Sequence, residues 1–149
     1  MDANEKRKVI LENYSHPYNM GIEETDGYIK TNSNNVSCID NIDLYVKIEN
    51  DIIKDVRFTG EACAVAISST SIMLKEIIGK SIDDVLAYTS QFKNMVDDEP
   101  YDSNILNNAN VFDNVVRTGN RKVCAYLPYN ALLEAIDIYN GVDLKEKKG

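Results

Sequence analysis

The chain has 149 residues, of which 44% are hydrophobic and 27% are charged. These proportions are ordinary for a globular protein, and the length suffices for one domain with a hydrophobic core. The net charge of −8 argues against nucleic acid and anionic membranes as partners, since both attract basic surfaces. No apolar run approaches the roughly 18 residues of a membrane span, and no export signal is evident. We therefore expect a cytoplasmic protein.

The N-terminal part of the chain predicts one helix and a first strand. Residues 4–14 carry an apolar side typical of a short helix. Residues 15–21 contain Pro, Asn and Gly, which favour turns. A first strand is expected at about 27–31, followed by a polar turn at 32–35.

Residues 40–49 give the clearest strand pattern in the chain, since apolar and polar side chains alternate with a period of two. Asn50 and Asp51 suit a two-residue hairpin turn. The partner strand is expected at 52–59, with its alternation broken at Lys54. These segments predict a small antiparallel sheet with one wet face.

Beyond the hairpin the period changes from two to 3.6, which indicates helices. Residues 63–78 form the first of these, and 81–95 the second, which begins at a capping-box-like Ser81. The Asn-rich stretch 101–110 is expected to be a loop or a poorly formed helical turn, while a four-three-four spacing of apolar residues from Ile105 to Val116 makes a third helix plausible.

A last helix is expected from about Cys124 to Asn140, with its regular part starting at Pro128 because proline disfavours a helix interior. The polar tail 142–149 is expected to be mobile. We therefore predict a single domain over 1–149 of the α+β class, in which about three antiparallel strands pack against four to five helices.

The three cysteines each fall at the junction of two predicted elements. Three is an odd number, and a reducing compartment disfavours disulfides. A buried cysteine that acts only as a small hydrophobe remains the plain alternative. Cys63 and Cys124, however, each open a predicted helix, and a helix N-terminus favours the thiolate form that binds metal. Cys38 ends a polar loop at the mouth of a strand.

Cys38 and Asp40 are two positions apart, so their side chains fall on one side of an extended segment and can share a metal ion. The sequence therefore predicts a metal or cluster site of Cys38, Asp40, Cys63 and Cys124. Zinc accepts such a mixed sulfur and oxygen set, and an oxygen ligand would make the site labile. His16 is a competing fourth ligand.

Arg121 lies three residues before Cys124 and is a candidate for the surroundings of the site. There it would lower thiolate pKa values or pair with Asp40 when no metal is bound. The plain alternative is a loop arginine that faces water.

Several motifs, in order and spacing over almost the whole chain, resemble the IscU/SufU family of iron–sulfur cluster assembly proteins. The matching segments are His16-Pro-Tyr-Asn-Met-Gly21, Ser37-Cys-Ile-Asp40, Phe58-Thr-Gly-Glu-Ala-Cys63, Ser69-Thr-Ser71 with Met73, Gly79-Lys80 and Arg121-Lys-Val-Cys124-Ala-Tyr-Leu127. The chain departs from the family at Tyr18, Ile39 and Ala62, where the family has Arg, Gly and Gly. The missing glycines restrict backbone approach at the metal.

The resemblance is greatest to the SufU branch. Val123 stands where IscU-type scaffolds have a histidine, and residues 118–121 contain no Leu-Pro-Pro-Val-Lys motif. Sixty residues lie between Cys63 and Cys124, which fits the longer spacing of the SufU branch, and Arg121 matches an arginine of that branch.

Membership in this branch implies zinc held by Cys38, Asp40, Cys63 and Cys124, and a pyridoxal-phosphate cysteine desulfurase as partner. It also implies that Cys38 accepts sulfur as a persulfide, with Cys124 as a possible second acceptor and Arg121 nearby. The protein would be a sulfurtransferase-like accessory protein that serves downstream iron–sulfur acceptor or scaffold proteins. Two alternatives stay open: a scaffold that assembles a transient 2Fe–2S cluster on the same residues, and an interaction domain with a structural zinc.

Overall fold

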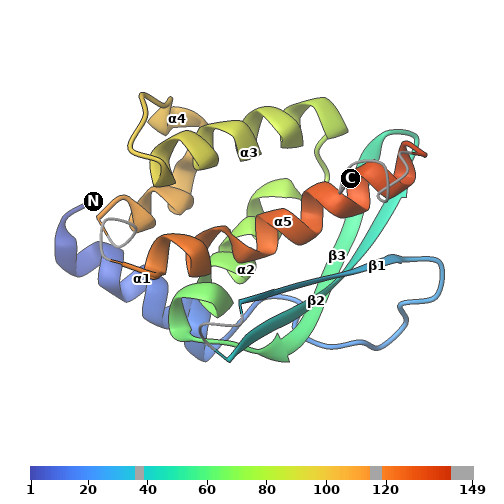
Figure 1. The fold of residues 1–149 in the computed structure, drawn as a ribbon, viewed down its shortest axis with the longest axis horizontal. Helices are drawn as coiled ribbons and strands as arrows, with labels where there is room; N and C mark the ends of the chain where they lie inside the picture. The colour runs from blue at the N-terminus through green and yellow to red at the C-terminus, as the bar shows by residue number, and fades with distance from the viewer. Residues whose placement is uncertain (36–38, 115–118, 142–149) are drawn as a thin grey trace.

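A computed structural model describes residues 1–35, 39–114 and 119–141; the tail 142–149, expected to be mobile, lies outside them. The elements are α1 (Ala3–Ser15), β1 (Ile29–Asn35), β2 (Asp40–Glu49), β3 (Ile52–Glu61), α2 (Ala64–Ile77), α3 (Ile82–Val96), α4 (Ser103–Leu106), the 3-10 helix η1 (Asn107–Phe112) and α5 (Arg121–Tyr139). The strands form an antiparallel sheet in the order β1-β2-β3 (Figure 1). The predicted α+β class is confirmed.

The core lies between one face of the sheet and the helices. Alternate residues of β2 and β3 point inward and are fully buried: Ile42, Leu44, Val46, Ile53, Val56 and Phe58. α5 lies across β1 and β2, and α2 packs against α5 and β3 (Figure 1). α3 packs on α5, and α1 packs on α2. No helix in the described ranges is long and apolar enough to cross a membrane.

The predicted hairpin is confirmed, together with the reason for its irregularity. Residues 50 and 51 have φ of +53° and +61°, the conformation of a tight two-residue turn. Ile53 and Asp55 pair with consecutive residues of β2, so Lys54 between them is left out of the pairing. Lys54, where the alternation fails, is therefore the extra residue of a β-bulge.

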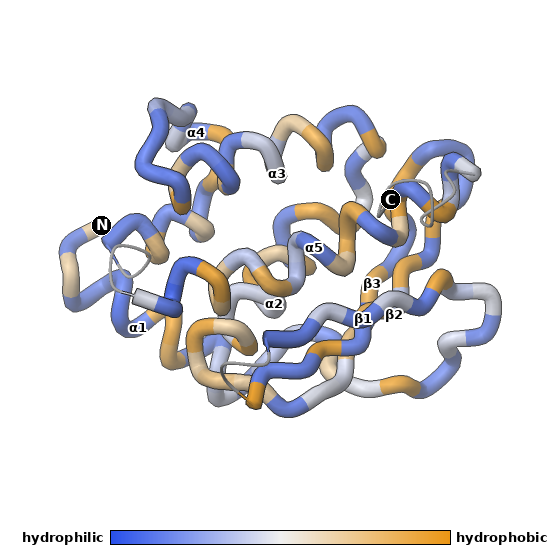
Figure 2. Tube along the Cα trace, in the orientation of Figure 1, coloured by the Kyte–Doolittle hydropathy of each residue, from blue (hydrophilic) through white to orange (hydrophobic). Residues whose placement is uncertain are grey.

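The first strand is longer than predicted, and the turn expected at 32–35 is wrong. β1 continues to Asn35, although Figure 2 shows few hydrophobic residues along it. Thr31 is buried and its Oγ1 donates to the carbonyl of Ala131 in α5 at 2.8 Å. On the other face, the Asn32 amide donates to side chains of β2. Polar contacts on both faces thus replace the apolar ones that a strand pattern requires.

Of the two alternatives expected for the Asn-rich segment 101–110, the poorly formed helical turn is confirmed and the loop is wrong. A continuous third helix does not form among the described residues. Asp102 caps the short helix α4, and η1 follows it directly. The side-chain amide of Asn110 donates to the carbonyl of Ser103 at 2.7 Å, so asparagines satisfy backbone groups that a regular helix would pair itself. Val116, the last member of the expected apolar stripe, lies outside the described residues.

The starts of α1, α2 and α3 agree with the sequence patterns. α1 covers the expected 4–14 within a residue at each end. Cys63 is the N-cap of α2, and the Ser81 hydroxyl accepts the N–H of Asp84 at 3.2 Å at the start of α3. These junctions fix where the strand region ends and the helical region begins.

α5 begins at Arg121, three residues before the predicted start at Cys124. Pro128 was expected to open the regular part, but it lies inside the helix and is buried. A proline there has no N–H for the carbonyl of Cys124, four residues earlier, and the helix continues without that bond. Cys124 is consequently in the second turn of α5 rather than at its first residue.

Candidate metal centre

Three residues from distant parts of the chain meet at one end of the sheet. Asp40 is the first residue of β2, Cys63 joins β3 to α2, and Cys124 lies near the start of α5. One carboxylate oxygen and the two sulfur atoms all lie within 4.8 Å of one another. Three converging donors of this kind form a candidate metal site.

The β2–β3 pairing brings Asp40 and Cys63 together. Asn41, next to Asp40, pairs with Glu61, two residues before Cys63. Gly60 makes this approach possible, because a Cβ atom there would lie 2.1 Å from the carbonyl oxygen of Asn41. Its φ of +145° is also one that other residues rarely adopt.

Asp40 is a buried carboxylate with only 3% of its surface exposed, and hydrogen bonds hold it in place. The backbone N–H of Cys63 donates to its Oδ1 at 2.7 Å. The Cys63 thiol donates to Oδ2 at 3.5 Å, and the same sulfur accepts the N–H of Ala66 at 3.5 Å as the cap of α2. The carboxylate is therefore aimed at the sulfur atoms by the protein itself.

Cys124 is buried, whereas Cys63 is exposed. Burial raises the pKa of the Cys124 thiol well above its usual range, and the neighbouring Asp40 and Cys63 side chains act in the same direction. Burial therefore opposes the thiolate form that a helix N-terminus was expected to favour at this group. A metal ion must displace the proton of this thiol, so metal binding releases a proton here.

The other predicted site residues have different positions. Cys38 lies outside the described residues, so the four-residue ligand set stays a prediction. Its neighbour Ile39 is 88% exposed, next to the buried Asp40. His16 ends α1, is exposed, and does not belong to the group of converging donors.

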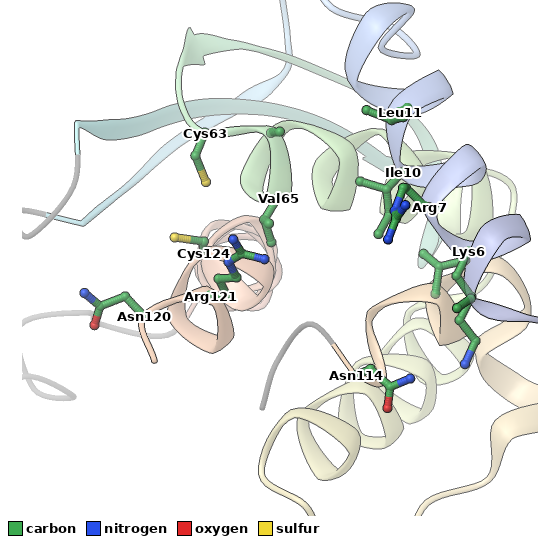
Figure 3. A pocket seen from close by; sticks show the side chains of 13 residues that line it. Lys6, Arg7, Ile10, Leu11, Cys63, Val65, Asn114, Asn120, Arg121 and Cys124 are labelled. Atoms are coloured by element: carbon green, nitrogen blue, oxygen red, sulfur yellow. The ribbon is translucent and has the colours of Figure 1, made fainter. Parts of the chain in front are cut away.

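Arg121 is the first residue of α5 and is exposed. Figure 3 shows its side chain beside Cys124, on the wall of a pocket. The predicted pairing of Arg121 with Asp40 does not form among the described residues: no ion pair joins them. Arg121 does lie close to the sulfur atoms, as expected.

The rest of this pocket was not predicted from the sequence. Lys6 and Arg7 line it from α1. The run Glu5-Lys-Arg-Lys8 is visible in the sequence, but nothing in its spacing indicates which of these side chains faces the cysteines.

The donor set fits a borderline metal ion. Two sulfur atoms and one carboxylate oxygen suit zinc, and they leave one position of a tetrahedron to be filled. Sulfur ligands also suit iron in iron–sulfur clusters. The chemistry of the described residues is therefore compatible with either metal.

Comparison with known proteins agrees with this chemistry. Residues 5–146 match the family model of the NifU-like N-terminal domain. The chain is 33% identical over 131 residues to the zinc-dependent sulfurtransferase SufU of Bacillus subtilis, covering 87% of this chain and 88% of the relative. It is 33% identical over 129 residues to the iron–sulfur cluster assembly scaffold protein IscU of Streptococcus pyogenes, covering 86% and 80%.

A solved structure of a similar protein has the same fold. FiSufU of Fervidobacterium islandicum AW-1, described as an iron–sulfur cluster assembly scaffold protein for the SUF system, superposes with a TM-score of 0.79 at 30% identity. The match covers 86% of this chain and 93% of that one. Sequence, fold and the convergence of Asp40, Cys63 and Cys124 lead to one conclusion: the chain belongs to the NifU-like N-terminal domain family, the IscU/SufU family of iron–sulfur cluster assembly proteins.

Proposed function

We propose that this protein accepts sulfur from a pyridoxal-phosphate cysteine desulfurase and passes it on during iron–sulfur cluster assembly. It would do so as a zinc protein, with Cys38, Asp40, Cys63 and Cys124 as ligands in a single domain. The observation that carries the proposal is the approach of the Asp40, Cys63 and Cys124 donor atoms to within 4.8 Å of one another. The zinc-dependent sulfurtransferase SufU of Bacillus subtilis is a relative over most of the chain.

The proposed transfer is an exchange between a persulfide and a thiol. The Cys38 thiolate attacks the outer sulfur of the desulfurase persulfide, a new S–S bond forms on Cys38, and the desulfurase cysteine leaves as a thiolate. No net oxidation occurs. Bound zinc would supply the positive charge that keeps ligand cysteines deprotonated at neutral pH. Cys124 is a possible second acceptor, and Arg121 beside it adds positive charge.

Asp40 has a distinct part in this proposal. The N–H of Cys63 occupies its Oδ1, and its Oδ2 faces the sulfur of Cys63. A carboxylate kept in this position supports the metal site while a cysteine ligand is exchanged for an incoming group.

The test is a desulfurase assay with the cognate enzyme, run with and without this protein and with its zinc chelated. We expect stimulated turnover that is lost on chelation and in Cys38→Ser, with labelled persulfide on Cys38 of the unmodified protein. Unchanged turnover in Cys38→Ser, with a lowered thermal stability, would instead favour an interaction domain with a structural zinc. Label trapped on Cys124 but never on Cys38 would overturn the assignment of the acceptor.

The second candidate function is a scaffold for a transient 2Fe–2S cluster. The Streptococcus pyogenes relative carries the scaffold description at the same identity as the Bacillus subtilis sulfurtransferase, which is the observation in its favour. Metal analysis and visible spectra separate the two. A colourless protein with about one zinc per chain supports sulfur transfer, and a brown protein after reconstitution with iron and sulfide supports the scaffold. In either case we propose a cytoplasmic location and protein acceptors downstream.

A further inference from the structure

We propose that the pocket beside Cys63 and Cys124 binds a small thiol that carries carboxylate groups, and that this molecule takes sulfur from the protein. The inference rests on the proposed sulfur transfer and names a substrate class for it. Three features of the pocket carry the inference: its size, its charge and its position next to the sulfur atoms.

The pocket has a volume of about 760 Å³ and lies between α1, η1 and the first turns of α2 and α5 (Figure 3). This volume is within the range of roughly 300–1,000 Å³ that holds small ligands in proteins. Apolar side chains form much of its wall: Ile10, Leu11, Val65 and Val111. An apolar wall of this kind suits an organic molecule better than a bare inorganic anion.

The charge of the pocket is opposite to that of the chain. Lys6, Arg7 and Arg121 line it, and no acidic residue is among the described residues of its wall, although the chain has a net charge of −8. Lys6 is paired with Asp113 at 2.8 Å. Arg7 and Arg121 have no ion pair or hydrogen bond from their side chains to any described residue. Two guanidinium groups are thus available to bind carboxylates.

The start of α5 adds to this positive potential. Asn120 precedes the helix and lines the pocket, but its side chain makes no capping hydrogen bond. The first N–H groups of the 19-residue helix therefore lack a side-chain partner at their own cap, and such groups attract anions.

The position of the sulfur atoms defines the rest of the ligand. Figure 3 shows the sulfur atoms of Cys63 and Cys124 at one end of the pocket, with Arg121 beside them and Arg7 and Lys6 towards the other end. A molecule bound by its carboxylates at the arginines has its remaining part directed along the pocket to the cysteines. A thiol is the group that can take sulfane sulfur from a persulfide at this end of the pocket, where Cys124 is the possible second acceptor.

The reaction is balanced without an oxidant or reductant. The ligand thiolate attacks the outer sulfur of a persulfide on the protein, and an S–S bond forms on the ligand. The S–S bond of the protein persulfide breaks, and the cysteine leaves as a thiolate. The proton lost by the ligand thiol is returned to that cysteine or to solvent, so one thiol and one persulfide give one persulfide and one thiol.

The test uses the zinc-loaded full chain and glutathione as the probe, titrated by calorimetry. Glutathione diethyl ester, which lacks the carboxylate charges, is the matched ligand. S-methylglutathione, which has no free thiol, shows whether binding depends on the carboxylates rather than on zinc extraction. We expect saturable binding of glutathione and S-methylglutathione, and at least a tenfold loss for the ester. Equal binding of ester and acid, or no saturable binding, would overturn the proposal.

Arg7→Gln and Lys8→Gln form a matched pair of variants. Both remove one positive charge from α1, but Arg7 lines the pocket and the exposed Lys8 does not. Loss of a charged hydrogen-bond partner predicts about tenfold weaker glutathione binding in Arg7→Gln, with zinc content unchanged and little effect in Lys8→Gln. Equally weakened glutathione binding in the two variants would contradict the proposal, because the loss would then follow from the net charge of the protein and not from a contact in the pocket.

Transfer is then measured on protein loaded with persulfide chemically, by polysulfide, so that no desulfurase is needed. We expect glutathione persulfide to form at a rate that saturates with glutathione, and saturation to require higher concentrations in Arg7→Gln. A rate linear in glutathione and equal in both variants overturns the transfer. If the expected glutathione binding and transfer are observed but the desulfurase does not load the protein, the proposed desulfurase partnership fails and the pocket proposal stands. If the desulfurase loads the protein but glutathione neither binds nor takes sulfur as expected, only the pocket proposal fails.

Discussion

Ser69 makes the contact that we expect to set the distance between the sulfur atoms of Cys63 and Cys124. It lies in α2, the helix that Cys63 caps, and its hydroxyl donates to the carbonyl of Ala125 in α5 at 2.5 Å. Ala125 directly follows Cys124. Ser69 is 1% exposed and Ala125 is fully buried. This hydrogen bond therefore joins the two thiol-bearing helices close to the thiols, and we predict that Ser69→Ala loosens the metal site.

The magnitude follows from the bond that is lost. A buried neutral hydrogen bond contributes about 1 kcal/mol to stability, and an acceptor left without any partner costs about 1–3 kcal/mol. The Ala125 carbonyl also lies inside a helix, where a backbone N–H can serve it, so we expect a loss of about 1–2 kcal/mol in the free energy of unfolding. Groups that orient metal ligands typically change metal affinity by roughly 10–100-fold, and we expect Ser69→Ala to fall in that range.

Thr31→Val is the matched control. Thr31 also donates a buried hydroxyl to a carbonyl of α5, that of Ala131, at 2.8 Å. Ala131 lies seven residues beyond Cys124, about 10 Å further along the helix. Both variants lose the same kind of hydrogen bond to the same helix, so both should lose similar stability without metal. Only the bond beside Cys124 should alter the site.

The assay is competition for zinc against a chromophoric chelator, with the visible spectrum of the cobalt-substituted protein as a second measurement. Ser69→Ala should weaken zinc binding and change the cobalt spectrum, and Ser69→Thr, which keeps the hydroxyl, should restore both in part. Thr31→Val should leave both close to the original. Equal loss of zinc affinity in the two variants would refute the reasoning, because the effect would then follow global stability.

Three further predictions concern other parts of the structure. Gly60→Ala should destabilise the protein by about 2 kcal/mol or more in urea unfolding, because its Cβ would meet a carbonyl of β2 at 2.1 Å and its φ is positive; a neutral result would contradict the close approach. Asp40→Ala should have a much larger effect on the rate of zinc exchange, which should rise, than on the free energy of unfolding. An unchanged exchange rate would show that the carboxylate is not a ligand. Burial raises the pKa of the Tyr88 and Tyr129 hydroxyls, which lie 3.0 Å apart. The contribution of these hydroxyls to the free energy of unfolding is complete below pH about 10, the pKa of tyrosine in the unfolded chain, and it falls as the pH rises above that value. Tyr88→Phe should therefore make stability decline less steeply at alkaline pH. An unchanged slope of stability against pH would refute the assignment.

The regular parts of the fold could be predicted because their apolar residues are periodic. Alternation over 40–49 points to one buried face, and the structure buries that face. The helical spacing over 63–78 predicts the helix that forms there, although α2 is buried on every side from Ala66 to Leu74. β1 could not be predicted in full, because its buried position Thr31 is polar and its partner on α5 lies 100 residues away. A hydrogen bond over that separation leaves no local pattern in the sequence.

The site could be predicted in part for a similar reason. Cysteines at the ends of elements indicated a meeting point, and Asp40, Cys63 and Cys124 do meet. The positive pocket was missed because its cations come from α1 and α5, whose approach depends on tertiary packing. The start of α5 was placed too late because Pro128 was expected to begin the regular helix, whereas the packed helix accommodates it.

The way in which Asp40 is held bears on how the site would exchange a ligand. An oxygen donor is a weaker ligand than a thiolate for a soft metal site, which suggests that the carboxylate is the first to leave. In the structure, however, Asp40 is buried and fixed by a short bond from the N–H of Cys63, whereas the Cys63 thiol is exposed and its hydrogen bonds are long. A released carboxylate would stay in place and rebind at once. In the proposed site, ligand exchange would therefore fall to an exposed thiol, with Asp40 as the fixed point.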